Sequence, residues 1–383
     1  MAEISGFVFP NEAVEWTILI ATYPYITGLV AGSFIVSALV YVFNNQKFKP
    51  IGKLAFLTSL VFLLLSFLPL VAHLRQPQRA FEIMTSPNFS SAMAAFGYIY
   101  GFYLLLAIVE GLFLFRVGCV LRREAARGLT RVVYTILTLG TKDTSERAAS
   151  RDMTVVRILA FIGIPTAVLF HGYVGFIFGA VKANPLWSTP LMPVVFLLSA
   201  AVSGTAVLLL IYCGWAYLSG GRPVASIVSA TAVLLGWFLL IDVGFHTLEE
   251  LYRAYERTAS WAIVEATLYS QLYWSHIWGE FIIGALIPLA AIAIPAIRRS
   301  GAAMTLVSIL VLAGVFAMRW NVVIGAQLIS RSGQGFLSYV PPLLGRESVF
   351  SVVGLLAASL FLLILLTSIL PWRDEKVEVT KLG

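Results

Sequence analysis

The residues best suited to proton chemistry fall into two short series in the carboxyl-terminal half of the sequence. Asp242, His246 and Glu250 recur every four residues, and His276 and Glu280 are likewise four apart. On a helix, this spacing brings side chains to one face, and a histidine beside a carboxylate can change charge near neutral pH. We therefore expect a proton-linked site, with a structural ion pair or hydrogen-bond clamp between helices as the alternative.

The composition decides which solvent surrounds these residues. The 383 residues are 59% hydrophobic and 12% charged, with a mean hydropathy of +0.90. A soluble domain has about 25% charged residues, so lipid is the main solvent here. The net charge is +7, but the basic residues are not gathered with aromatic residues into a patch for nucleic acid. The composition indicates a multi-pass membrane protein and argues against a nucleic-acid partner.

Apolar runs long enough to cross a bilayer, about 20 residues each, recur along the whole chain. We expect one all-α integral membrane domain covering residues 1–383. The basic, partly amphipathic connection over residues 121–153 is expected to lie on the membrane surface. The nine expected spans are residues 15–43, 51–74, 90–119, 153–183, 188–219, 224–253, 271–298, 302–319 and 346–371.

The distribution of Lys and Arg predicts the orientation of these spans. With the amino terminus outside, the inner segments hold 17 basic residues and the outer segments hold 8. Because basic residues favour the cytoplasmic side, we expect the amino terminus outside and the carboxyl terminus inside. The first residues are acidic, unlike the basic start of a cleavable signal peptide, so we expect the first span to be retained.

This topology gathers the histidines toward one side of the membrane. All four, His73, His171, His246 and His276, fall in or beside the outer half. Ionisable groups at membrane depth are costly and normally face a bundle interior or a water-filled cavity, where they often relay protons. We therefore expect the site in the outer half of the bundle.

Three acidic or amide residues lie outside the two series. Glu110 belongs to the inner half of the third span, and Arg157 is its candidate partner. Glu110 either takes part in a proton relay or forms a buried structural pair. Glu15 follows Asn11 at the outer end of the first span, at the level of the histidines. An interfacial cap is the simpler interpretation of Glu15.

Metal centres find little support in the sequence. The two cysteines, Cys119 and Cys213, are too few for an ordinary four-cysteine iron–sulfur cluster and form no CxxC pair; we interpret them as isolated thiols. His171 and His246 could face each other across a bundle as haem b ligands, and His246, His276, Asp242 and Glu280 could hold a non-haem metal, but no spacing favours either. We therefore assign no metal ligands.

Small residues four apart predict close helix contacts, because helices associate in lipid by tight packing. These pairs are Gly28 and Gly32, Gly97 and Gly101, and Gly175 and Gly179. No convincing internal repeat accompanies them, which disfavours a transporter built from inverted repeats.

Four stretches of the sequence, in order, resemble the NrfD/polysulfide-reductase family of membrane subunits. They are "EWTILIATYPYITGLVAGSF", "HLRQPQRAFEIMTSPNFSSAMAAFGY", "HGYVGFIFGAVKANPLWSTPLMPVVFLLSA" and "RWNVVIGAQLISRSGQGFLSYVPP". Together they run from about Asn11 to Pro342, nearly the whole chain. The sequence departs from the family pattern at His73, where relatives usually have an acid, and at Glu15, where some relatives have a histidine.

The resemblance implies a subunit that exchanges electrons and protons with the quinone pool of a prokaryotic cytoplasmic membrane. It implies no iron–sulfur cluster in this chain, a ferredoxin-like iron–sulfur partner docked outside, and a molybdopterin oxidoreductase or multihaem cytochrome subunit that performs the substrate chemistry. The exchangeable substrate would be a quinone of the menaquinone or ubiquinone type.

A quinone head group needs aromatic walls, hydrogen-bond donors at its carbonyls and a proton route. The expected proton-transfer residues are His276, Asp242, His246, Glu280 and Glu110. The expected head-group contacts are Asn11, Glu15, Tyr23, His73, His171, Tyr173, Tyr273, Arg319, Asn321 and Gln327.

Two alternatives remain open at this point. The segment from Arg319 to Pro342 is either an outer interfacial connector or a lid over the quinone site, with Arg331 at a docking surface for the iron–sulfur partner. The intramembrane acids and the helix prolines are also compatible with a proton-coupled secondary transporter. A neighbouring gene for a Cys-rich ferredoxin-like protein would favour the quinone interpretation.

Overall fold

The computed structural model describes residues 5–88, 90–257 and 260–373, and these fold into helices joined by short connections. Within this part of the chain, nine helices are long and apolar enough to cross a membrane, which confirms the expected all-α bundle. Two basic residues of the charge count, Lys376 and Lys381, lie outside the described residues. The spans are α1 (Ile18–Tyr41), α2 with α3 (Lys49–Leu65 and Leu68–His73), α5 (Ala92–Ala125), α7 (Glu146–Gly179), α8 (Met192–Leu218), α9 (Ala225–Glu256), η4 with α11 (Trp274–Leu286 and Ile287–Ala293), α13 with η5 (Gly301–Val323 and Gly325–Leu328) and α14 (Val349–Ile369).

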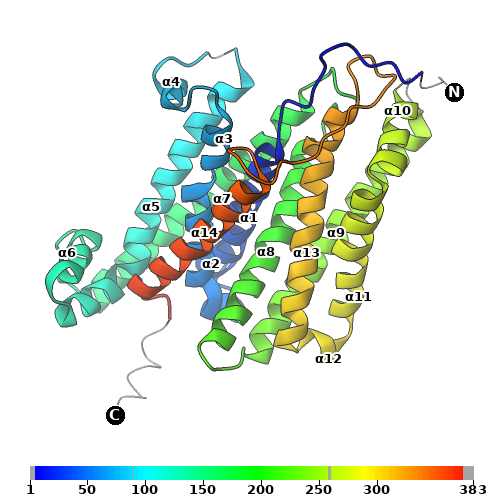
Figure 1. Ribbon diagram of the computed structural model, residues 1–383. Coiled ribbons are helices and arrows are strands. Elements are labelled where there is room, and N and C mark those ends of the chain that lie inside the picture. Colours follow the sequence, from blue (N-terminus) through cyan, green and yellow to red (C-terminus); the bar gives the residue numbers. More distant parts are fainter. Residues whose placement is uncertain (1–4, 89, 258–259, 374–383) are drawn as a thin grey trace.

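Short helices cap the two ends of this bundle. The end where α4 and α10 lie also carries residues 5–16 and the loop before α14, and we call it the amino-terminal face; α6 and α12 lie at the opposite end, the α6 face (Figure 1). The short elements are η1 (Gln46–Phe48), η2 (Pro77–Arg79), α4 (Glu82–Thr85), α6 (Gly128–Leu137), α10 (Trp261–Ala266), η3 (Thr267–Gln271) and α12 (Pro295–Arg298).

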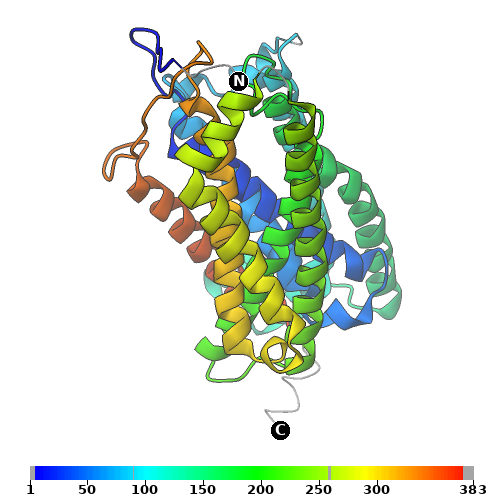
Figure 2. The same cartoon turned by 90° about the vertical axis from the view of Figure 1, so that its right-hand side faces the viewer.

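The spans form two groups that share a central interface. Helices α1, α2, α5 and α7 pack on one another, and α8, α9, η4–α11 and α13 form the second group. Helix α1 joins the groups, because it packs against α8 and α13 as well as α2 and α7, whereas α14 packs mainly on α2 (Figures 1 and 2).

The two groups meet at a close backbone crossing of α1 and α8. A Cβ added at Gly32 would lie 1.8 Å from the Ala200 carbonyl oxygen, so only glycine fits there. A Cβ added at Gly175 would lie 2.7 Å from the Met192 carbonyl oxygen. Both contacts confirm small-residue packing, whereas Gly97 and Gly101 face side chains of α4.

The seventh and eighth spans differ from the expected ones. The seventh is not a regular helix over 271–298: it begins as a π-helix, η4, and breaks at Ile294, whose extended backbone precedes Pro295. The eighth does not end at Arg319, because α13 continues to Val323. The first residues of the polar segment Arg319–Pro342 therefore lie inside the bundle. The sequence had predicted that they would lie in an outer loop.

Candidate functional site

The two polar series meet face to face between α9 and η4. The His276 ring lies between two carboxylates: its Nδ1 is 3.2 Å from Glu280 Oε2, and its Nε2 is 3.0 Å from Glu250 Oε1. The His276 side chain is only 5% exposed. An imidazole in contact with an acid on each side can take a proton from one and give it to the other.

The unusual helix η4 sets the position of this histidine. Thirteen residues, Trp274–Leu286, are π-helical, a form with i→i+5 bonding that is rare and frequent at functional sites. Close packing fixes the helix against α13, because a Cβ added at Gly284 would lie 2.4 Å from Gly314 Cα. The contact brings side chains near the end of α13 within reach of η4.

Asn321 on α13 is one of these side chains. Its Nδ2 donates to Glu280 Oε2 at 2.9 Å, and its Oδ1 accepts from Ser275 Oγ at 2.6 Å. Since a carboxylate only accepts and a hydroxyl can donate, the two partners agree on the orientation of the amide. Asn321 therefore holds Glu280 in place.

Two small cavities flank this cluster. One, of about 20 Å³, is lined by Asp242, His246 and Glu280 and has room for about one water molecule. The other, of about 80 Å³, is lined by His246, Glu280 and His276, with Met192, Val195 and Leu186 among its apolar walls. Glu280 and His246 thus border both cavities.

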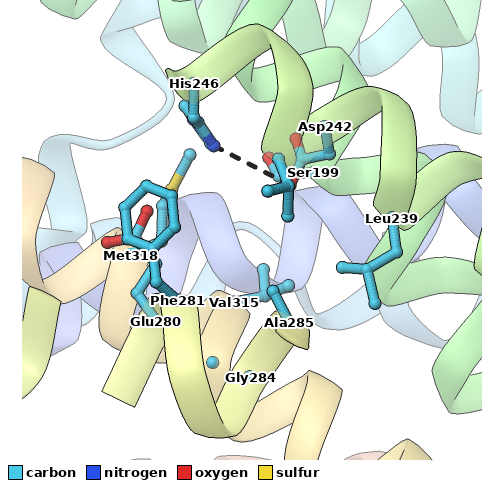
Figure 3. A pocket seen from close by; sticks show the side chains of 12 residues that line it. Ser199, Leu239, Asp242, His246, Glu280, Phe281, Gly284, Ala285, Val315 and Met318 are labelled. Carbon is cyan, nitrogen blue, oxygen red and sulfur yellow. Dashed lines mark ion pairs between the residues drawn. The ribbon is translucent and has the colours of Figure 1, made fainter. Parts of the chain in front are cut away.

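Figure 3 shows how Asp242 and His246 approach each other beside the smaller cavity, with Glu280, Phe281 and Met318 opposite. Asp242 Oδ2 lies 3.9 Å from His246 Nδ1, and Asp242 Oδ1 has no hydrogen-bond partner among the described residues. A carboxylate oxygen at a cavity wall is available to bind water or a polar ligand. Asp242 therefore extends the polar site toward the bundle interior.

Arg319 is fully buried and contacts Ser199, which lines the smaller cavity. Its Nη2 donates to Ser199 Oγ at 2.6 Å and lies 3.2 Å from His171 Nε2, while its guanidinium stacks 4.0 Å from the Phe196 ring centre. Because arginine has no acceptor, His171 accepts through Nε2 and donates through Nδ1 to Thr27 Oγ1, 3.1 Å away. The expectation that Arg319 and Asn321 belong to an outer lid is wrong, since both are buried residues of α13.

Both ring nitrogens of His171 are thus engaged, by Thr27 and Arg319. Among residues 5–88, 90–257 and 260–373, no group of three or more His, Cys, Asp or Glu side chains is arranged to hold a metal ion. Cys119 and Cys213 are separate buried thiols, as expected.

Several expected site residues lie elsewhere on the amino-terminal face. His73 Nδ1 lies 3.1 Å from Glu347 Oε1, so the end of α3 contacts the loop before α14. Gln327 Oε1 accepts from the backbone N–H groups of Glu15 and Trp16, at 3.2 and 2.9 Å. Gln327 therefore anchors the start of α1, and Glu15 contributes its backbone to this contact.

Asn11 adopts a left-handed backbone with φ 61° in the same segment. Its neighbour Glu12 accepts from Ser330 Oγ at 2.8 Å and from the Arg331 N–H at 2.6 Å. Although burial raises the pKa of Glu12, these hydrogen bonds and the Arg331 charge outweigh it, so the pKa lies below its ordinary value. Asn11 thus belongs to a segment that Glu12 fixes to the 330–339 loop.

The expected tyrosine contacts are also dispersed. Tyr23 is buried in α1 with its ring against Phe96, and Tyr173 OH donates to the Ala92 carbonyl at 2.7 Å. Tyr273 is 39% exposed and packs against Trp274. The structure does not bring these rings to the His276 cluster.

Glu110 is fully buried in α5, and neither of its carboxyl oxygens has a hydrogen-bond partner among the described residues. The expected pairing with Arg157 is wrong, because Arg157 Nε instead donates to the Tyr41 carbonyl at 3.4 Å. Glu110 is therefore a buried acid separate from the His276 cluster.

Three polar residues of the cluster were not predicted from the sequence. Ser275 and Tyr269 lie near His276 in sequence; Tyr269 OH donates to Glu250 Oε2 at 3.1 Å. Burial raises the pKa of Tyr269 to about 12, so the phenol keeps its donor hydrogen. Their nearness to His276 in the sequence could have indicated Ser275 and Tyr269. The third residue, Ser199, lies in an apolar span, and its sequence position does not indicate a role in the cluster.

Comparison with known proteins identifies the family of this chain. The chain matches the family model described as polysulphide reductase, NrfD, over residues 7–330. It is 30% identical to a selenate reductase subunit of Mesobacillus selenatarsenatis, over 95% of this chain and 88% of that protein. It is 24% identical to a polysulfide reductase chain of Wolinella succinogenes, over 85% of this chain and 99% of that protein. It is 25% identical to the Hdr-like menaquinol oxidoreductase integral membrane subunit of Archaeoglobus fulgidus, over 83% of this chain and 72% of that protein. With nine helices in its described part that are long and apolar enough to cross a membrane, and a family match over most of its length, this chain belongs to the NrfD family of polysulphide-reductase membrane proteins.

Proposed function

We propose that this chain is the membrane subunit of a respiratory oxidoreductase and exchanges electrons and protons between a membrane quinol and a partner iron–sulfur subunit. The His276 ring between Glu250 and Glu280, beside a cavity, carries the proposal. Family membership supports it, as do relatives named as subunits of a selenate reductase and of a menaquinol oxidoreductase. A secondary transporter would not need to be a subunit of an oxidoreductase.

Quinol oxidation releases two electrons and two protons, so a site must accept both protons as the electrons leave. Glu280 lines both cavities and is the residue that would accept a proton from a quinol hydroxyl. His276 would pass this proton to Glu250, which contacts Tyr269 nearer the amino-terminal face. Asp242 and His246 line the smaller cavity and would accept the second proton. Quinone reduction would use the same groups in reverse.

The larger cavity has apolar walls that suit the carbon ring of a quinone and polar walls that suit its two oxygen atoms. Met192, Val195 and Leu186 would contact the ring, whereas His276 and Asn321 would face its oxygen atoms. Ligand sites commonly combine apolar walls with few convergent polar groups. We expect the ring to be of the menaquinone or ubiquinone type.

The partner subunits follow from the same proposal. Electrons leaving the quinol need an acceptor, and a ferredoxin-like iron–sulfur subunit docked on the amino-terminal face would provide it. A molybdopterin oxidoreductase or a multihaem cytochrome would carry the electrons to the terminal substrate. Purification of the native assembly with identification of its subunits tests this: a protein that purifies alone from native membranes contradicts the proposed role.

A substitution at His276 tests the proton route. His276→Gln keeps hydrogen-bonding atoms but loses the titratable ring, and we expect quinol turnover to fall at least about 100-fold, the usual contribution of a positioned acid–base group. The measurement is quinol oxidation by the purified native assembly in vesicles. Glu256→Gln, which changes an exposed acid at the end of α9, serves as the control. Full turnover in His276→Gln would remove this residue from the route.

Proton translocation is a separable part of the proposal. Glu110, buried in α5 without a hydrogen-bond partner among the described residues, is the candidate for a proton connection toward the α6 face. In the same sealed vesicles, we expect Glu110→Gln to lower the number of protons released per quinol while turnover persists. An unchanged proton yield would exclude Glu110.

A further inference from the structure

A groove lined by apolar side chains runs between α5 and α14 toward the α6 face. Helix α14 packs on α2 and leaves a space of about 170 Å³ beside α5. Its walls include Leu60 of α2, Ile108 and Leu112 of α5, Leu366 of α14 and Leu137 of α6. The groove therefore offers contacts from four elements to a ligand shaped like an acyl tail.

Two basic side chains, Lys53 and Arg122, contact the end of α14 next to the groove residue Leu370, and we call them the basic rim. Arg122 Nη1 donates to the Ile369 carbonyl at 3.1 Å, and Tyr134 OH donates to the same oxygen at 2.9 Å. Lys53 Nζ donates to the Pro371 carbonyl at 3.4 Å. These donors fix the end of α14 to α2, α5 and α6.

Helix α6 adds an exposed amphipathic surface next to that rim. Leu129, Val132 and Ile136 follow helical spacing and are 79%, 53% and 66% exposed. Such a stripe on a basic helix suits the boundary between head groups and acyl chains. Tyr134 of the same helix contacts α14, so α6 is held beside the groove.

Two exposed arginines belong to this helix. Arg127 is the residue just before α6, and Arg131 lies one turn before Tyr134. Neither forms an ion pair within the described part of the chain, unlike Arg116, which pairs with Asp152 at 2.6 Å. Their charges are available to an anion at the membrane surface.

We infer that the groove and α6 together form a binding site for one anionic phospholipid. One acyl chain fills the space between α5 and α14, and the phosphate of the anionic head group contacts Arg127 and Arg131. The charge of the rim favours this occupant over a zwitterionic phospholipid, which has no net charge, and over a quinone tail, which has no anion. The site is separate from the His276 cluster and does not depend on the proposed function.

Native mass spectrometry of the purified full-length protein tests the site, with phosphatidylglycerol and phosphatidylcholine of identical acyl chains as probes. We expect one tightly retained phosphatidylglycerol and weaker retention of phosphatidylcholine. Because each cation near a lipid surface contributes about fivefold in affinity, Arg127→Gln and Arg131→Gln should each weaken phosphatidylglycerol retention by about that factor. Arg147→Gln changes an exposed arginine of α7 and should have no effect.

A bulky residue in the groove tests the acyl-tail position. Ile108→Trp should lower retention of both lipids, whereas Ile158→Trp, on the exposed surface of α7, should not. Size-exclusion chromatography shows whether each variant folds; if Ile108→Trp does not, the two arginine variants decide. Equal retention of the two lipids, unchanged binding by the arginine variants, or displacement of phosphatidylglycerol by a long-tailed naphthoquinone would each overturn the inference.

Discussion

At the scale of single residues, the site is defined by contacts between ionisable groups from different helices. His276 contacts Glu280 within η4 and Glu250 across the interface with α9. Asn321 from α13 donates a hydrogen bond to Glu280. Arg319 donates to Ser199, which lines the smaller cavity, and to His171. Each polar group at this depth is costly unless it is paired, so the network stabilises the acids that the proposed proton route uses.

Asn321→Leu tests this dependence at one residue. The change removes the donor to Glu280 and the acceptor for Ser275, and each buried group left unpaired costs about 1–3 kcal/mol. If Glu280 must be held for proton transfer, we expect quinol turnover to fall about 10–100-fold. The measurement is the pH profile of turnover in the native assembly.

Ser275→Ala is the matched control for Asn321→Leu. It removes one hydrogen bond but leaves the Asn321–Glu280 contact intact, so the loss should be smaller than in Asn321→Leu. Equal losses in the two variants would show that Glu280 does not depend on Asn321.

At the scale of elements, the amino-terminal segment is held against the loop that precedes α14. The Gly6 N–H donates to the Gln334 carbonyl at 2.7 Å, and Gln327 binds the backbone at Trp16. Glu12 joins the same two segments through Ser330 and Arg331. These contacts connect the start of α1 to the end of α13, so they close the amino-terminal face over the bundle.

The lowered pKa of Glu12 predicts how this closure responds to acid. A carboxyl whose pKa is lower in the folded state stabilises folding above its ordinary pKa, and this stability is lost as the pH falls through the lowered value. We therefore expect residues 5–16 to become more susceptible to pepsin between about pH 5 and pH 3, as Glu12 is protonated. The rate of cleavage in that segment is the measurement.

Glu12→Gln should flatten this pH dependence, because the amide does not titrate. Glu82→Gln alters an exposed carboxylate paired with Arg79 in another loop of the same face and should leave the cleavage profile unchanged. A profile that stays equally steep in Glu12→Gln would rule out Glu12 as the titrating group.

At the scale of the whole molecule, two groups of helices are joined through α1. Its interface with α8 has no room for a side chain at Gly32. Helices in lipid associate by close packing rather than by a hydrophobic drive, so this crossing determines how the His276 cluster sits relative to the first group. Helix α14 lies outside both groups and forms one wall of the proposed lipid groove.

Gly32→Ala tests the crossing. The added Cβ would lie 1.8 Å from the Ala200 carbonyl oxygen, so the helices must separate, and we expect a loss of at least about 3 kcal/mol in stability, the upper range for overpacking. Thermal unfolding of the full-length protein in nanodiscs is the measurement. Gly28→Ala is the control, because a Cβ there would lie 3.4 Å from the His171 ring, an ordinary contact. Equal stability of the two variants would contradict the importance of this crossing.

The sequence by itself determined the solvent, the class of fold and the family. Its apolar runs predict nine spans, because a run long enough to cross the bilayer must satisfy its backbone as a helix. Four-residue spacing also indicated that Asp242, His246 and Glu250 share a face, since helix geometry is local. The order of the family motifs predicted a membership that the family match confirms.

Tertiary structure alone decided which of these residues meet. Sequence spacing does not show that His276 contacts Glu250 on another helix, that Asn321 holds Glu280, or that Arg319 is buried beside Ser199. It also led to the wrong partner for Glu110 and to an outer position for Arg319. Contacts between helices depend on crossing points such as Gly32 with Ala200 and on the π-helix η4, Trp274–Leu286. These features are set by packing across the whole bundle, which the local periodicity of a sequence does not encode.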